Sequence, residues 1–261
     1  MLTSTVAVRG DFAPTPPTLF SNDTNRKRKD AELEAARATV ARIYASSVDA
    51  RHRSYAQRMS NCSDGFRCKV ASCTVCTFKT ALFNRARTFK ALDHEWTKHP
   101  RDQLLSVTLS VRNPEIGELR TTIQGMNKAL TRLVPALNSK GWVRSLEVTP
   151  SEENEAHPHF HALMLFKQRT ALPTTAELQH VWAESAKLDY LPNVWAAPVA
   201  EYWAQPPTSN SHVVTAVRYT FKAADPALYA DPDYFLVYSD QLHDLHGRHS
   251  LCGGVLQGIF N

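Results

Sequence analysis

Residues 141–166 read GWVRSLEVTPSEENEAHPHFHALMLF, and this stretch decides the fold. Its first part, residues 142–149, follows a glycine and is rich in apolar and β-branched side chains, which predicts a strand. A short polar linker at 150–156 leads into a second apolar run at 157–166. A linker of this length favours antiparallel pairing of the two runs. The stretch therefore predicts the centre of an antiparallel sheet.

Strand and helix patterns alternate on both sides of this strand pair. Residues 103–111 (QLLSVTLSV) alternate apolar with small polar side chains, as in a strand with one apolar face. Helices are predicted over 116–137, 174–187 and 211–224, and a further strand over 194–203. This order predicts an α+β fold with a mostly antiparallel sheet and helices on one face.

Composition divides the chain into three parts. Residues 1–29 are rich in Pro, Thr, Ser and Asn and end in four basic residues, which is typical of a flexible basic tail. Residues 30–98 are expected to form an N-terminal helix over about 30–59, a cysteine-rich module and a second helix over 77–97. Residues 99–261 are expected to form the domain that carries the sheet.

The charge balance is weakly basic. The 30 Lys and Arg residues exceed the 25 Asp and Glu residues, for a net charge of +5 and a pI near 9.0. An excess of this size favours an anionic partner such as nucleic acid but also fits many proteins that bind none. The chain contains no apolar run long enough for a signal peptide or a membrane span. We therefore expect a soluble, cytoplasmic protein with no membrane partner.

Three histidines recur at every second position: His157, His159 and His161. On a strand all three leave the same face, about 7 Å apart from one to the next. Neighbouring members of such a row can share one metal ion, and Glu147 on the adjacent strand would add an oxygen that suits Mg²⁺ or Mn²⁺. The alternative is that they are surface histidines without a metal.

Four of the five cysteines lie close together in the sequence, with the spacing Cys62-x5-Cys68-x4-Cys73-x2-Cys76. In a chain without secretion signals this cluster favours a structural Zn²⁺ site over a disulfide framework. The alternative is four reduced cysteines without metal. Cys252 is left over and is interpreted as a small apolar residue.

Tyr219 lies on the predicted helix at 211–224. At 100° per residue, the apolar side chains of this helix cluster on one side, while Arg218, Tyr219 and Lys222 fall on the other. The pattern predicts a phenol on an open helix face with a cation one turn away. The alternative is a tyrosine that covers the edge of the core.

Several of these motifs together resemble a known family. HPHFHALML resembles the histidine-hydrophobe-histidine motif of the HUH endonucleases, in the form found in plasmid rolling-circle replication initiators. SVTLSV, RSLEVTPSEENEAHPHFH and RYTFKAAD match the preceding strand, the glutamate-then-histidines arrangement and the tyrosine segment of that family. The resemblance spans about residues 60–230 and implies a ferredoxin-like, RRM-like sheet.

The resemblance also implies an activity. It implies metal-dependent, site-specific nicking of single-stranded or hairpin DNA at a plasmid origin, followed by strand transfer through a 5'-phosphotyrosine. Tyr219 would be the nucleophile, Lys222 a second catalytic residue and Arg218 a DNA contact. Mg²⁺ or Mn²⁺ would be held by His159, His161 and Glu147, with His157 as a further candidate ligand. Host helicase and polymerase are the implied partners.

Initiators of this type resemble the chain in carrying a cysteine cluster before their first strand. Basic residues around this cluster are expected to contact the DNA backbone or to hold the N-terminal helix: Arg67, Lys69, Lys79, Arg85 and Arg87. One departure concerns termination, because Thr215 stands where single-tyrosine initiators carry a glutamate. The alternatives are a transposase or relaxase with the same chemistry, or a zinc-containing DNA-binding regulator without catalysis.

Overall fold

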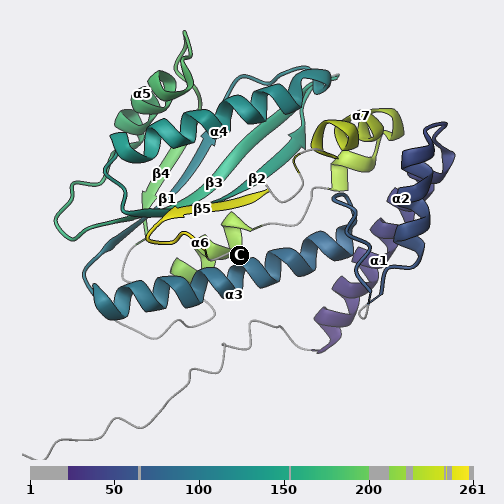
Figure 1. Cartoon of the computed structure of the whole chain (residues 1–261), viewed down its shortest axis with the longest axis horizontal. Helices are drawn as coiled ribbons and strands as arrows, with labels where there is room; N and C mark the ends of the chain where they lie inside the picture. Colours follow the sequence, from purple (N-terminus) through teal and green to yellow (C-terminus); the bar gives the residue numbers. More distant parts are fainter. Residues whose placement is uncertain are drawn as a thin grey trace, which may run out of the picture.

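A five-stranded antiparallel sheet forms the centre of the molecule (Figure 1). The computed structural model describes residues 23–63, 66–152, 154–199, 212–221, 226–243, 245 and 249–258. The strand order is β4-β1-β3-β2-β5. The strands are β1 (Gln103–Ser110), β2 (Gly141–Pro150), β3 (Ala156–Phe166), β4 (Val194–Pro198) and β5 (Ser250–Gly254). The α+β class and the antiparallel sheet predicted from the sequence are confirmed.

Helices cover both faces of this sheet. Phe160, Ala162 and Met164 of β3 face a core built with α4 (Leu119–Ala136) and α5 (Thr175–Ala186). Leu163 and Leu165 face the opposite core, built with α3 (Thr74–Lys98) and α6 (His212–Thr220). Figure 1 shows these two helical layers on either side of the strands. The prediction of helices on one face was wrong, because β3 is apolar on both faces over its second half and must be covered on both.

The β2–β3 pair is antiparallel, as the sequence predicts, and its register decides where Glu147 lies. Glu147 lies directly opposite His159, and Ser145 lies opposite His161. Directly opposed residues of an antiparallel pair project from the same face. Glu147 therefore shares a face with the histidines, the face that α3 and α6 cover.

The N-terminal region contains two helices where the sequence predicted one. α1 spans Asp23–Ser46 and α2 spans Ala50–Ser60. The break has a local cause, because the Asp49 carboxylate accepts a hydrogen bond of 2.7 Å from the Arg51 backbone and caps α2. Residues 23–29, assigned to the tail from the sequence, are helical, and residues 1–22 lie outside the described part.

Three further element boundaries differ from the prediction. The helix predicted over 116–137 begins as a single 3-10 turn, η1 (Ile116–Glu118), before α4. The strand predicted over 194–203 ends at Pro198, and residues 200–203 lie outside the described part. The helix predicted over 77–97 begins three residues earlier, at Thr74. No described helix is both long and apolar enough to span a membrane.

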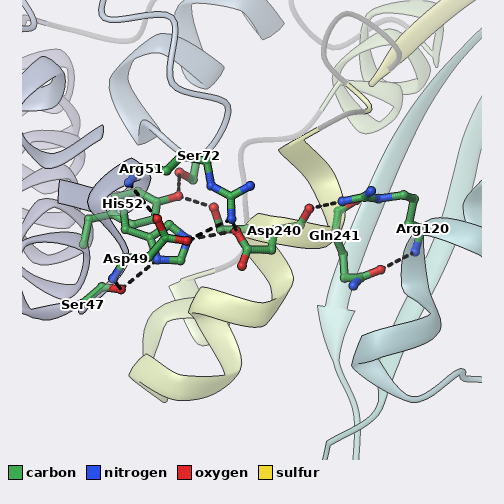
Figure 2. A network of polar contacts seen from close by, with 10 residues as sticks. Ser47, Asp49, Arg51, His52, Ser72, Arg120, Asp240 and Gln241 are labelled. Atoms are coloured by element: carbon green, nitrogen blue, oxygen red, sulfur yellow. Dashed lines mark hydrogen bonds and ion pairs between the residues drawn. The ribbon is translucent and has the colours of Figure 1, made fainter. Parts of the chain in front are cut away.

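A helix that the sequence did not predict, α7 (Pro232–His243), joins the N-terminal helices to the sheet domain. It follows a short 3-10 turn, η2 (Pro226–Tyr229). Asp240 of α7 accepts from Arg51 at 2.7 Å and from His52 at 2.9 Å, both on α2 (Figure 2). On the other side, Arg120 of α4 donates to the Gln241 carbonyl at 3.1 Å. α7 therefore fixes the position of α2 relative to α4.

Candidate active site

Glu147, His159 and His161 meet on the face of the sheet beneath α3 and α6. A Glu147 carboxylate oxygen lies 2.9 Å from His159 Nε2 and 2.5 Å from His161 Nε2. One ligand atom from each residue lies within 4.8 Å of the others. Two imidazoles and a carboxylate that converge in this way form a donor set for a divalent cation.

The other ring nitrogens of the two histidines face hydrogen-bond partners. His159 Nδ1 lies 3.2 Å from the His157 carbonyl, and His161 Nδ1 lies 3.2 Å from the Thr108 hydroxyl. A carbonyl only accepts, so it assigns the proton of neutral His159 to Nδ1 and leaves a lone pair on Nε2. That lone pair points at the Glu147 carboxylate, so two acceptors face each other. A cation bound between them would remove this conflict, and in that sense the residues fit a metal.

His157 lies at the edge of this group. Its ring is tilted by 39° relative to that of His159 with centroids 5.0 Å apart, and its Nδ1 lies 2.6 Å from the Asn113 side-chain oxygen. Burial lowers the pKa of His157, and the neighbouring His159 imidazole adds to this effect. The three closely grouped ligand atoms do not include an atom of His157.

Tyr219 stands next to the histidines. Its ring packs edge-on against the His161 ring with centroids 4.4 Å apart, and the side chain is 42% exposed. Val213, Val214 and Val217 on the other side of α6 are fully buried. The predicted open and apolar faces of this helix are thus confirmed. Lys222, the predicted catalytic lysine, lies outside the described residues.

Arg85 of α3 holds the end of α6 in place. Its guanidinium donates to the Phe221 carbonyl at 2.5 Å and to the Arg218 carbonyl at 3.2 Å. These carbonyls belong to the last turn of the helix that carries Tyr219, where carbonyls lack intrahelical partners. Burial, with the charge of nearby Arg218, lowers the pKa of Arg85. Sequence analysis counted Arg85 among the basic residues of the cysteine module and missed this contact, which depends on the packing of two distant helices.

The four clustered cysteines come together at the start of α3. Cys62 Sγ lies 3.5 Å from Cys76 Sγ and 3.9 Å from Cys73 Sγ, and Cys68 Sγ lies 3.6 Å from Cys76 Sγ. Zn–S bonds of about 2.3 Å give tetrahedral edges of about 3.8 Å, so the spacing fits Zn²⁺. The hydrogen bond from Cys73 lowers the pKa of Cys68 to about 5, which favours a thiolate. All four are buried and none of them forms a disulfide.

One row of residues crosses the sheet through the site. The pairings place Trp195 of β4 opposite Thr108 of β1, which lies opposite His161. The row continues through Ser145 of β2 to Ser250 of β5. Trp195 is half exposed on the edge strand, two strands from His161. Trp195 was not among the site residues predicted from the sequence. Its position on a predicted strand did not indicate that this strand would pair with β1.

Comparison with known proteins identifies the family. A family model described as "Replication protein" matches residues 60–261, more than half of the chain. The chain belongs to this family of replication proteins. It is 30% identical over 145 residues to Protein rep of Streptococcus pneumoniae, covering 51% of this chain and 45% of that relative. It is 27% identical over 170 residues to Protein rep of Lentilactobacillus hilgardii, covering 60% and 54%.

A longer match covers more of both chains. Protein rep of Lactiplantibacillus plantarum is 24% identical over 205 residues, covering 74% of this chain and 65% of that relative. The chain thus spans about half to two thirds of the length of these replication proteins. No solved structure matches it significantly. The matched family region contains the cysteine cluster, the histidine strand and Tyr219.

Proposed function

We propose that this replication protein initiates rolling-circle replication of a plasmid by nicking single-stranded DNA at the origin with Tyr219. The observation that carries the proposal is the contact between the rings of Tyr219 and His161. The Nε2 atom of the same histidine lies 2.5 Å from a Glu147 carboxylate oxygen. The proposed nucleophile therefore contacts one of the proposed metal ligands, and the tyrosine itself is 42% exposed. A replication protein needs a 3'-hydroxyl for synthesis, and a nick in DNA supplies one.

The chemistry follows from the residues present. The Tyr219 oxygen attacks the scissile phosphorus and forms a phosphotyrosine bond as the phosphorus–3'-oxygen bond breaks. The phenol proton passes to solvent, to which the side chain is open, and the departing 3'-oxygen takes up a proton to give a free hydroxyl. Attack by a 3'-hydroxyl on the same linkage reverses the step and transfers the strand. No nucleotide cofactor is needed.

Glu147, His159 and His161 would hold one Mg²⁺ or Mn²⁺ ion, which supplies charge to polarise the phosphate and stabilise the leaving oxygen. His157 orients His159 by accepting at its carbonyl, and its own ring is a candidate additional ligand. Arg218 places a cation in the last turn of α6, where a phosphate backbone would approach Tyr219.

Cys62, Cys68, Cys73 and Cys76 would hold a structural Zn²⁺ ion. In support, the four sulfur atoms have the spacing of a tetrahedral site, and they come from the segment after α2 and from the first turn of α3, so the metal would join the two helices. The same cluster packs in one core with α1 and with Phe235 of α7. The proposed zinc thus stabilises the module rather than taking part in the reaction.

The test is formation of a covalent protein–DNA complex. Purified protein would be incubated with a labelled single strand carrying its plasmid's origin, with and without Mn²⁺ or Mg²⁺. We expect a slowly migrating covalent band that requires the ion and is lost in Tyr219→Phe. Tyr234→Phe removes a phenol hydroxyl from α7 and is the matched control. Binding to DNA without cleavage would contradict the proposal and support a regulator.

A further inference from the structure

A cavity of about 400 Å³ lies between the proposed metal site and the cysteine module. Glu147 and His161 form part of one wall. Residues 69–72, the loop between Cys68 and Cys73, line the same cavity together with Cys76. The volume is in the range of sites that enclose a small ligand or one unit of a polymer. A ligand in this cavity would contact the active site and the cysteine module at once.

The wall next to Glu147 is polar. Asn84 of α3 is buried and its amide nitrogen donates to the Ser250 hydroxyl at 3.1 Å. Within the described part of the chain, neither the Asn84 side-chain oxygen nor the Ser145 hydroxyl has a hydrogen-bond partner. Ser145 lies opposite His161 in the sheet. The cavity therefore presents a donor and acceptors at a fixed place beside the ligand set.

The remaining walls are apolar and aromatic. They are formed mainly by Val70, Phe221, Leu228, Tyr229, Phe235 and Tyr238. A ligand that fits must have broad apolar faces and a polar edge. A nucleobase has this combination, and aromatic side chains bind bases through their faces in many single-strand binding proteins.

We propose that this cavity binds one unpaired base of the DNA strand that crosses the active site, and that Asn84 and Ser145 read its edge. The proposal rests on the proposed nicking function, because the phosphate of the bound nucleotide would lie at Glu147 and His161. An amide side chain can pair with two atoms of a base edge and so distinguish one base from the others. The cavity is then a determinant of which sequence the protein cleaves.

The experiment uses the full chain and a pool of single-stranded DNA randomised around a candidate nick site, with Mn²⁺. Both the bound and the cleaved fractions are sequenced, for wild type, Asn84→Ala and Ser145→Ala. We expect a wild-type preference at one position next to the nick that falls about tenfold or more in Asn84→Ala. Preferences at other positions should persist. Ser145→Ala should weaken the preference at the same position, and because it removes a single hydroxyl from a half-buried residue it guards against a folding defect in Asn84→Ala.

The control is Gln124→Ala, which removes an exposed amide from α4 on the other side of the sheet. It should keep the wild-type preference everywhere. Wild-type preference at every position in both Asn84→Ala and Ser145→Ala would overturn the proposal. If wild type binds the pool without cleaving it, the nicking function fails, and the bound fraction alone still decides whether Asn84 selects a base.

Discussion

The rings of Tyr219 and His161 pack edge-on with centroids 4.4 Å apart, although 58 positions separate them in the chain. α6 brings the tyrosine there by burying its valines against β3. The Nε2 atom of His161 also lies 2.5 Å from the Glu147 carboxylate. The ring contact therefore links the proposed nucleophile to the proposed ligand set.

Glu147→Gln is expected to lower the nicking rate by about a hundredfold or more, because it removes the anionic ligand between the two histidines. The rate should be measured over a range of Mn²⁺ concentrations, and the variant should need more ion. His157→Ala is the comparison, since His157 lies outside the closely grouped ligand atoms. It should lose less activity than His159→Ala. Equal losses in the two histidine variants would show that His157 is a full ligand.

Cys73→Ser is expected to release zinc and to lower the melting temperature by about 10 °C, because metal binding at a structural site contributes directly to folding. Metal content would be measured by elemental analysis, and unfolding by circular dichroism. Cys252→Ser on β5 is the control and should keep the metal. A fully stable, metal-free wild-type protein would support four reduced cysteines instead.

Arg85→Gln is expected to lower the rate of the cleavage step about ten- to a hundredfold while leaving DNA affinity closer to wild type, because the last turn of α6 loses its partner and Tyr219 shifts. Single-turnover kinetics with saturating protein separate the two quantities. Arg85→Lys should recover part of the rate, and Lys90→Ala at an exposed position of the same helix should behave as wild type. A loss confined to affinity would make Arg85 a DNA contact instead.

Trp195→Ala is expected to weaken binding of single-stranded DNA about tenfold, because an aromatic ring on the row through His161 can stack a base of the bound strand. Trp195→Phe should keep most of the affinity. Phe83→Ala removes a ring of similar exposure from α3 and should have little effect. Fluorescence anisotropy with a labelled oligonucleotide gives the affinities, and unchanged binding in Trp195→Ala would exclude this stacking.

Much of the sheet was predictable because its strands carry their pattern locally. The antiparallel pairing of the strands that carry Glu147 and His159 followed from two adjacent apolar runs and a short linker. The open face of Tyr219 followed from helical periodicity within one element. These predictions needed no knowledge of which distant segments meet.

The unpredicted parts depend on contacts between distant segments. β5 is a short edge strand with two glycines, and its sequence does not alternate apolar and polar side chains. Its pairing with β2 therefore could not be predicted from a local pattern. Arg144 is a charged residue on the buried face of β2, where its guanidinium lies 4.3 Å above the Phe160 ring and donates to the His249 carbonyl at 3.1 Å. No periodicity in the sequence predicts either feature.

The most direct test of the central claim is to identify the amino acid that becomes attached to DNA. After reaction with the origin strand and Mn²⁺, the protein would be digested with nuclease and trypsin and analysed by mass spectrometry. We expect a nucleotide joined through its 5'-phosphate to the peptide at residues 219–222, YTFK. A nucleotide on any other peptide, or cleaved DNA with no attached protein, would contradict it.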